Sequence, residues 1–522
     1  MIDIEISVRN YRCFGDEPAT LEIRDGFTAI IGTNNSGKSS LLRLPYEIRQ
    51  LIQMFTEFDG SRFSRAYRIL AGEEGGTLWQ PMVSRGERIQ RAGAERPMEI
   101  IFKINDGPNG PFLLGGTPVE LVSTYTFQSY DTKAWLQYAG TRERINIERE
   151  YNSLNINSLK EAMRFLTNSM YVGPFRNAIN IGGQEKYYDI QTGDAFVKRF
   201  AELKGGYNPA ANEEVSRLLD EVRRIFGFSQ LDVNASPDTE SLQVTIDGRS
   251  FRLNEQGAGL AHFIVVLVNV LVGRPSILLI DEPELNLHAS LQLDFLSTLA
   301  KFTEGSVLFA THSMGLARTA ADRIYTVSSK SDGTRRIREY ESDRDLATLA
   351  GQLSFDKRAG IGYTRILLVE GKSEIRALMQ LLRLYGKEHE VLMLPLHGDE
   401  MIRGDVEQEL LEVTRLSDSV SYLIDSERTS RGEPLSKSRQ GFVDLCDRLG
   451  IEGLVLERRA LENYLPEHAV VSAFGEQAKP LGPFEKKGSA QGWPKTNNWR
   501  AASRMRSDDL VGTDLGQFLA RL

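Results

Sequence analysis

The sequence predicts an α/β protein with two domains, and three observations lead to this prediction. Short apolar runs that read as strands alternate with segments of helical period, which is typical of sheets covered by helices. This alternation stops in a charged stretch at 328–345 and starts again at Thr364. With 522 residues, and roughly 100–200 residues per domain, the chain has room for two to four domains.

The first domain is expected to contain a largely parallel sheet with an inserted β-rich and helical region. A helix should begin at Ser39, directly after a Gly-rich turn. Strands are expected at Ile2–Val8, Phe27–Ile31, Met98–Ile104, Leu121–Phe127, Ala134–Tyr138, Arg144–Tyr151, Ser276–Ile280, Ser306–Ala310 and Arg323–Val327. Helices are expected at Leu159–Met170, Phe196–Leu203, Glu214–Phe226, Phe263–Val272 and Leu291–Phe302. A hairpin is expected to join Leu242–Ile246 to Phe251–Leu253.

The second domain should be smaller and built in the same way. Its expected elements alternate strand and helix: Ile366–Val369, Ser373–Tyr385, Val391–Leu396, Val406–Leu416 and Val420–Ile424. We place the first domain at 1–345 with insertions at about 45–250, a linker or helix at 346–363, and the second domain with a C-terminal extension at 364–522.

Composition excludes several classes of protein. The net charge of −8 excludes a basic protein that coats nucleic acid, although it leaves a local nucleic-acid site open. The two cysteines, Cys13 and Cys446, support neither a disulfide framework nor a zinc ribbon, and we expect a reducing, cytoplasmic setting. The apolar run Phe263–Val272 is shorter than the ~20 residues of a membrane-spanning helix, so no membrane role is expected.

A phosphate-binding loop is predicted between the strand Phe27–Ile31 and the helix that follows it. The segment Gly32-Thr33-Asn34-Asn35-Ser36-Gly37-Lys38-Ser39 matches GxxxxGK[ST] in a strand–loop–helix context. Such a loop points backbone N–H groups at phosphates, with the helix N-terminus adding its dipole. Lys38 would reach the β- and γ-phosphates of ATP, and Ser39 would bind Mg²⁺.

Acidic residues after a later apolar strand supply the expected partner of this loop. Asp281 would hold Mg²⁺, and Glu282 would act as general base on the attacking water. His312 follows another apolar strand, where it would contact the γ-phosphate. The same residues taken alone could be solvated strand ends or a structural histidine.

At this point the first domain resembles a known family of ATPases. The segments Val8–Phe14, Ile277–His288 and Phe309–Ser313 look like motifs of the ABC-type heads of structural-maintenance, RecF and OLD (overcoming lysogenisation defect) proteins. The resemblance implies a homodimer or higher homo-oligomer in which a signature loop of one subunit completes the ATP site of the other. Asn254–Leu260 would be that loop, with Gly257 and Gly259 as its ATP-contacting glycines, although it lacks the Leu-Ser-Gly-Gly form of transporters. A plain hairpin-to-helix turn is the alternative.

A second group of acidic residues is predicted to bind metal ions. Glu370 ends one apolar strand with Glu374 one helical turn later, and Asp425 and Glu427 end another. Because the carboxyl ends of parallel strands lie at the same edge of a sheet, these carboxylates should converge there. Carboxylates are hard oxygen ligands that suit Mg²⁺ or Mn²⁺. Solvated strand ends are the alternative.

The acidic segment Leu367–Glu374 resembles the first motif of the Toprim domain, and its fusion to an ABC-type head is similar to OLD nucleases. Where that family has Asp-x-Asp, this chain has Asp425-Ser426-Glu427, which moves one carboxylate outward. Glu462, in Leu461–Leu465, resembles a further metal ligand of OLD proteins, and Lys495 resembles a lysine that stabilises charge on the scissile phosphate.

Together these resemblances imply an ATP-dependent, metal-dependent DNA endonuclease in anti-phage defence. Two cations about 4 Å apart would hold the attacking water and the leaving oxygen of an in-line displacement, with Glu370 as bridging ligand or general base. The residues leave two alternatives open: an RNase, for instance on tRNA, or an ATP-dependent sensor or DNA-binding switch with an inactive second domain. A second defence subunit is a possible partner under any of these hypotheses.

Overall fold

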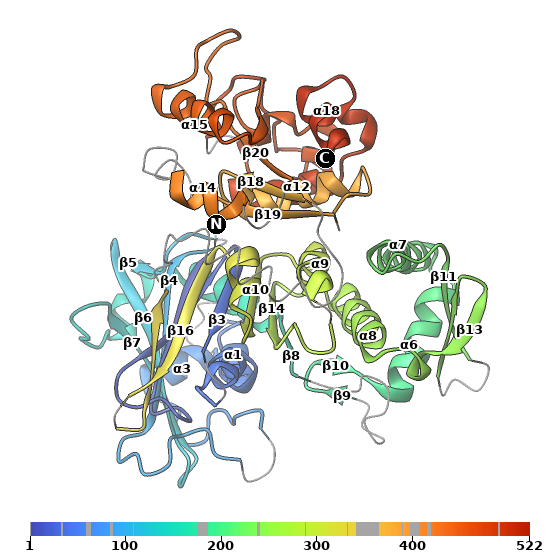
Figure 1. The fold of residues 1–522 in the computed structure, drawn as a ribbon. Coiled ribbons are helices and arrows are strands. Elements are labelled where there is room, and N and C mark those ends of the chain that lie inside the picture. Colours follow the sequence, from blue (N-terminus) through green and yellow to red (C-terminus); the bar gives the residue numbers. More distant parts are fainter. Residues whose placement is uncertain are drawn as a thin grey trace. The chain divides into compact units, whose positions relative to one another are not determined.

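The computed structural model describes residues 2–32, 35–58, 64–83, 87–107, 109–174, 186–236, 241–287, 289–330, 332–340, 365–388, 390–396, 407–414, 419–488 and 491–522. The chain forms two compact units, which are described separately below (Figure 1). Unit 1 comprises Met1–Ser313 and Arg323–Tyr340, and unit 2 comprises Met314–Asp322 and Glu341–Leu522. The predicted linker at 346–363 lies outside the described residues.

Unit 1 contains an antiparallel sheet in the order β2-β1-β4-β6-β5, with β7 also paired to β6. Side chains alternate between buried and half-buried along β1 and β4, so one face of this sheet packs on a core. The strands are β1 (Asp3–Arg9), β2 (Ala19–Arg24), β4 (Met98–Asp106), β5 (Leu113–Leu114), β6 (Thr117–Thr126) and β7 (Asp131–Tyr138).

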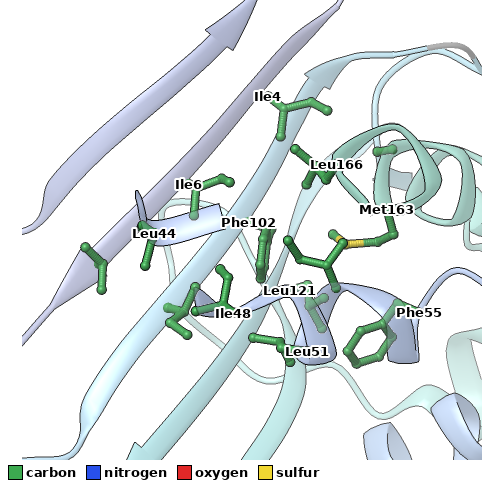
Figure 2. Packing of buried hydrophobic residues seen from close by; sticks show 14 of the residues in the cluster. Ile4, Ile6, Leu44, Ile48, Leu51, Phe55, Phe102, Leu121, Met163 and Leu166 are labelled. Carbon is green, nitrogen blue, oxygen red and sulfur yellow. The ribbon is translucent and has the colours of Figure 1, made fainter. Parts of the chain in front are cut away.

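Three helices pack against the buried face of this antiparallel sheet. They are α1 (Lys38–Glu47), α2 (Arg49–Met54) and α5 (Ile156–Thr167). Figure 2 shows Leu44 of α1, Leu51 of α2 and Met163 of α5 gathered around Ile6 and Phe102 of the strands. Each fully buried side chain of this size contributes about 1.5–3 kcal/mol of transfer free energy. The core therefore fixes α1, whose first turn carries the phosphate loop.

A second sheet of unit 1 has the order β17-β16-β3-β15-β14-β8, and all its neighbours are parallel except β17 and β16. Every residue of β3, β14 and β15 is buried, as expected for parallel strands covered on both faces. The strands are β3 (Gly26–Ile31), β8 (Ser169–Val172), β14 (Ile277–Asp281), β15 (Ser306–Thr311), β16 (Arg323–Ser329) and β17 (Arg335–Glu339).

The remaining described elements of unit 1 are mainly helical. The predicted hairpin is confirmed, because β12 and β13 pair antiparallel around Asp247 and Gly248, which both have positive φ. The elements are α3 (Arg65–Ala71), α4 (Ile147–Glu150), η1 (Tyr151–Ser153), β9 (Lys186–Tyr187), β10 (Ile190–Gln191), α6 (Gly193–Gly205), α7 (Pro209–Ile225), β11 (Leu231–Ala235), β12 (Leu242–Ile246), β13 (Arg249–Arg252), η2 (Leu253–Glu255), α8 (Ala258–Gly273) and α9 (Ala289–Lys301).

The expected largely parallel sheet is present, and strands of the expected β-rich insertion belong to the antiparallel sheet. Two predictions about unit 1 are wrong. The expected strand Arg144–Tyr151 is mostly helical, since α4 occupies Ile147–Glu150. The expected helix Leu159–Met170 ends at Thr167, and Ser169–Val172 forms β8 instead.

Unit 2 contains a parallel sheet in the order β19-β18-β20-β21. Its core includes Leu368 of β18, Leu394 of β19 and Ile424 of β20, with Phe442 and Cys446 of α15. The elements are α10 (Met314–Ala320), β18 (Arg365–Val369), α12 (Lys372–Arg383), β19 (Val391–Pro395), α14 (Glu407–Thr414), β20 (Val420–Ile424), α15 (Lys437–Arg448), β21 (Glu452–Val455), η3 (Leu461–Tyr464), α16 (Glu467–Phe474), η5 (Lys495–Asn497), α17 (Asn498–Ala502), η6 (Ser507–Leu510) and α18 (Asp514–Arg521). Within the described part of both units, no helix has the length and apolarity needed to cross a bilayer.

Candidate sites at the ends of parallel strands

The phosphate loop of unit 1 joins the end of β3 to the start of α1. Gly37 caps α1 with a φ of 103°, and a Cβ at this position would lie 2.6 Å from the Cys13 Sγ. A Cβ on Gly32 would lie 2.6 Å from the Val327 backbone oxygen. Both positions therefore require glycine. Asn35 also has a positive φ, whereas Asn34 lies outside the described residues.

Lys38 lies in the first turn of α1 and points back along the loop. Its Nζ donates to the Gly32 backbone oxygen at 2.9 Å and lies 3.2 Å from the His312 Nε2. Burial lowers the Lys38 pKa, and the nearby carboxylates of Asp281, Glu282 and Glu284 oppose this shift. The ammonium therefore sits between the loop and a group of acidic residues, where a bound phosphate would receive its charge.

Asp281 is the last residue of β14 and Glu282 follows it, so both acids lie at the strand end, as predicted. The buried Asp281 carboxylate accepts a hydrogen bond from the Tyr171 hydroxyl, with 3.2 Å between the oxygens. Burial and the Glu282 charge raise the Asp281 pKa, while the nearby Ser39 and Tyr171 hydroxyls and Lys38 lower it. A carboxylate held beside Ser39 in this way has the chemistry of a magnesium ligand.

Glu282 has a φ of 53°, and its N–H donates to the Ala310 oxygen at 2.9 Å. Its Oε1 lies 3.6 Å from the His312 Nε2. The structure thus brings Ser39, Lys38, Asp281, Glu282 and His312 together at the carboxyl ends of β3, β14 and β15.

Sequence reasoning missed two residues of this site, Glu284 and Tyr171. The Glu284 Oε1 accepts from the Thr311 hydroxyl at 2.7 Å and from the His312 N–H at 2.8 Å, so it fixes the backbone that carries His312. The sequence feature that could have identified Glu284 is its position as the third acid of Asp281-Glu282-Pro283-Glu284. Tyr171 was missed because the helix expected at Leu159–Met170 concealed β8.

The predicted signature loop lies at the start of α8. Gly257 is the residue before α8, and Gly259 lies in its first turn. A Cβ on Gly259 would lie 2.5 Å from the Asn286 backbone oxygen. This close approach is enough to explain a glycine at this position, whether or not a ligand binds there. The contact of Gly257 and Gly259 with ATP stays a prediction.

Three carboxylates of unit 2 surround one ammonium group. The Lys495 Nζ lies 3.0 Å from the Glu374 Oε1, 3.3 Å from the Asp425 Oδ2 and 3.8 Å from the Glu462 Oε2. All three carboxylates are buried, with Asp425 only 1% exposed, whereas Lys495 is half-buried. Glu374 comes from α12 beside the end of β18, Asp425 from the end of β20, and Glu462 from η3.

Burial raises the pKa of Asp425 well above its usual range. Lys495 lowers that pKa, whereas the charges of Glu374, Glu370 and Glu462 raise it. Burial lowers the pKa of Lys495, but the three carboxylates outweigh this effect and raise it overall. The cluster therefore depends on a cation at its centre.

Neighbouring groups orient these carboxylates. The Leu461 N–H donates to the Asp425 Oδ1 at 3.1 Å, and the Asn498 amide donates to the Glu462 Oε2 at 3.2 Å. Asn498 in turn accepts from the Trp493 indole N–H at 3.0 Å. A Cβ on Gly371 would lie 2.8 Å from the Glu374 Oε2, so glycine leaves room for this carboxylate.

The structure places two other predicted ligands in ion pairs. The Arg439 guanidinium binds both oxygens of Glu370, at 2.9 and 3.0 Å, and one of these oxygens also accepts from the Asp425 N–H. Glu370 is therefore next to the cluster, but its charge is paired with Arg439. Glu427 has a φ of 57° and pairs with Arg459, so it does not face Lys495 with the other carboxylates.

The three carboxylates fit a divalent cation by the chemistry of their hard oxygen donors, and Lys495 marks the position of positive charge. Within the described residues, no group of three or more His, Cys, Asp or Glu side chains is arranged to hold a metal ion as it stands. In this arrangement the positive charge beside the three carboxylates comes from the Lys495 ammonium.

Solved structures similar to this chain include three heads of Smc proteins, each 14% identical to it. They are an Smc head bound to the C-terminal winged-helix domain of ScpA (TM-score 0.37, covering 65% of this chain and 98% of that one), the SMC head domain from Thermotoga maritima (0.34, 66% and 100%), and an Smc head with an extended coiled coil bound to the C-terminal domain of ScpA derived from Pyrococcus furiosus (0.36, 69% and 100%). Among proteins with curated functions, none matches the sequence.

Two family models match parts of the chain, and apart from residues 314–318 the matched residues lie in unit 1. Residues 1–48, which include the phosphate loop, match a model described as an AAA ATPase domain. Residues 118–318, which include Asp281 and His312, match a model described as an AAA domain, putative AbiEii toxin, Type IV TA system. Unit 1 therefore carries a P-loop ATPase domain of the AAA type, which implies that ATP is its nucleotide.

Proposed function

We propose that the protein couples its ATPase domain to a metal-dependent nuclease in unit 2. The observation that carries this proposal is the convergence of Glu374, Asp425 and Glu462 on one cationic nitrogen at the end of a parallel sheet. Three buried carboxylates at one point are costly without positive charge, so such a cluster is typical of a cation site.

In the ATPase domain, each residue around the loop has one proposed role. Lys38 binds the β- and γ-phosphates, Ser39 and Asp281 hold Mg²⁺, and His312 contacts the γ-phosphate. Glu282 takes a proton from the attacking water, since its carboxylate lies beside His312. Gly257 and Gly259 are proposed to reach the ATP site of a second copy, which makes the active form a homodimer.

In unit 2, Glu374, Asp425 and Glu462 would hold Mg²⁺ or Mn²⁺, with Glu370 as an additional ligand if Arg439 releases it. A divalent cation bound there would supply a nucleophilic hydroxide and charge stabilisation for phosphodiester cleavage. Lys495, which is half-buried beside these carboxylates, would then be displaced toward the scissile phosphate, where its charge stabilises the oxygens.

DNA is the proposed substrate and antiviral defence the proposed role. The resemblance of Leu367–Glu374 to the Toprim motif, and of its fusion with an ABC-type head to OLD nucleases, supports a DNA substrate. The match of residues 118–318 to a model described as an AAA domain, putative AbiEii toxin, Type IV TA system, supports a role in defence.

Plasmid nicking tests this proposal. Purified protein is incubated with supercoiled plasmid and Mn²⁺, in parallel with Asp425→Asn and the matched control Glu452→Gln, which changes an exposed acid on β21. We expect wild type and Glu452→Gln to nick the plasmid, and Asp425→Asn to lose at least ~100-fold in rate.

Equal nicking by Asp425→Asn and wild type would place the activity outside the cluster and refute the proposal. Cleavage of RNA but not of DNA would indicate that the same site acts on RNA. Failure to cleave either nucleic acid, with Mn²⁺ binding also absent, would favour a sensor or DNA-binding switch with an inactive unit 2.

A further inference from the structure

Tyr171 lies on the strand next to the one that carries Asp281. β8 and β14 pair in parallel, and Tyr171 is the register partner of Leu279, two residues before Asp281. Its hydroxyl donates to the Asp281 Oδ2 at 3.2 Å, and both side chains are buried. Within the described part of the chain, the other carboxylate oxygen, Oδ1, has no hydrogen-bond partner. One oxygen is therefore held by the protein, and the other keeps its lone pairs for a ligand.

The backbone of Tyr171 is held by a half-buried ion pair between Arg49 and Asp189. The Tyr171 N–H donates to the Asp189 Oδ2 at 2.8 Å. Arg49 binds both oxygens of Asp189 at 2.7 Å and also donates to the Ser169 backbone oxygen at 2.9 Å. Because bidentate guanidinium–carboxylate pairs are geometrically specific, this ion pair fixes the position and the orientation of the short strand β8.

The ring of Tyr171 is held by two other tyrosines. Tyr188 packs against it edge-on with 4.9 Å between ring centroids, and Tyr46 packs against it with 5.9 Å. Tyr46 belongs to α1, the helix that begins with the phosphate loop. The Tyr171 hydroxyl is thus fixed relative to both Asp281 and the helix that carries Lys38 and Ser39.

We propose that Tyr171 is a positioning residue for the magnesium ion of the ATP site. It pins one oxygen of Asp281 and supplies a neutral donor to the carboxylate, so that the other oxygen faces the ion beside Ser39. This inference rests on the proposed role of Asp281 as a magnesium ligand, and it is independent of the nuclease proposed for unit 2. Partners that orient a metal ligand typically change metal affinity 10–100-fold when they are removed.

The test is the magnesium dependence of nucleotide binding in full-length protein. Fluorescence anisotropy of mant-ATP is measured in EDTA and across a Mg²⁺ titration for wild type, Tyr171→Phe, Asp281→Asn and the double variant. The control is Tyr188→Phe, which removes the hydroxyl of a ring in the same cluster that accepts from Arg43 rather than donating to Asp281. Phenylalanine keeps each ring in place, and thermal unfolding of each variant checks the fold.

For Tyr171→Phe, we expect mant-ATP affinity in EDTA to equal that of wild type, because Lys38 and the loop are unchanged. The Mg²⁺ concentration that gives half of the maximal change in mant-ATP anisotropy should rise at least ~10-fold. Tyr188→Phe should behave as wild type, and Tyr171→Phe should add nothing in the Asp281→Asn background, since the two residues act through one oxygen.

Three results would overturn the inference. One is an unchanged Mg²⁺ requirement in Tyr171→Phe. Another is a loss of mant-ATP affinity in EDTA that equals the loss in Mg²⁺, which would indicate a purely structural role. The third is a wild type whose mant-ATP binding does not respond to Mg²⁺. That result would also remove the proposed role of Asp281, whereas the first two would leave that role intact.

Discussion

Replacing Lys495 by methionine should destabilise unit 2 in a pH-dependent way. The substitution keeps the length of the side chain but leaves Glu374, Asp425 and Glu462 without the ammonium that now lies 3.0–3.8 Å from them. At an effective dielectric constant of about 20, each contact of this length is worth roughly 4–6 kcal/mol before desolvation is subtracted. Removing one partner of a buried ion pair costs about 3–5 kcal/mol. Because Lys495 is half-buried, solvent screening reduces the expected loss to about 2–3 kcal/mol.

The sign of the pH dependence follows from the raised pKa of Asp425. A carboxyl group with a raised pKa in the folded state stabilises the fold when it is protonated, and this contribution is lost as the pH rises through the folded pKa. Without Lys495 that pKa rises further, so the loss of stability in Lys495→Met should be larger at about pH 8 than at about pH 5.5. Mn²⁺ should restore more stability to the variant than to wild type, because it supplies the missing positive charge.

Differential scanning calorimetry measures this effect. At roughly 2–4 °C per kcal/mol for a unit of this size, the transition of unit 2 should fall by about 4–12 °C at the higher pH. Lys479→Met, which changes an exposed lysine of unit 2, is the matched control and should alter stability by less than about 0.5 kcal/mol. A variant that melts with wild type at both pH values would refute the reasoning that the cluster depends on this ammonium.

Three further predictions concern the ATPase domain. Lys38→Ala should weaken mant-ATP binding by roughly 10–150-fold, because a charged hydrogen-bond donor to phosphate is lost, and unchanged affinity would contradict the role of the loop. Glu282→Gln should keep ATP binding but lower steady-state phosphate release by about 10²–10⁴-fold; hydrolysis at the wild-type rate would exclude Glu282 as the base. Gly37→Ala should cost about 1–3 kcal/mol in urea unfolding, since φ is 103° and its Cβ would meet Cys13, whereas Gly441→Ala in open space on α15 should cost nothing. Equal stability of both glycine variants would contradict the steric argument.

The sequence was sufficient to predict the local parts of each site. The Gly32–Ser39 spacing and the acids after β14, β18 and β20 are short-range patterns, and the structure places them at strand ends as expected. The hairpin around Asp247 and Gly248 was predictable for the same reason, because its turn chemistry is local.

Long-range partners could not be predicted in this way. The pairing of Glu370 with Arg439 joins residues that are 69 positions apart, and that of Lys495 with Asp425 joins residues 70 apart. No periodicity encodes such pairs. β8 was missed because Ser169–Val172 follows α5 after a single residue and continues its apolar character, so the boundary had no Gly or Pro to mark it.

The cation site proposed for unit 2 consists of the carboxylates around Lys495. Its most direct test is Mn²⁺ binding without nucleotide, followed by the electron paramagnetic resonance signal of free Mn²⁺, in an Asp281→Asn background that removes the proposed metal ligand of the ATP site. We expect saturable binding that is lost when Asp425→Asn is added and is retained when Glu452→Gln is added. Absence of binding, or equal binding by the Asp425→Asn variant, would contradict it.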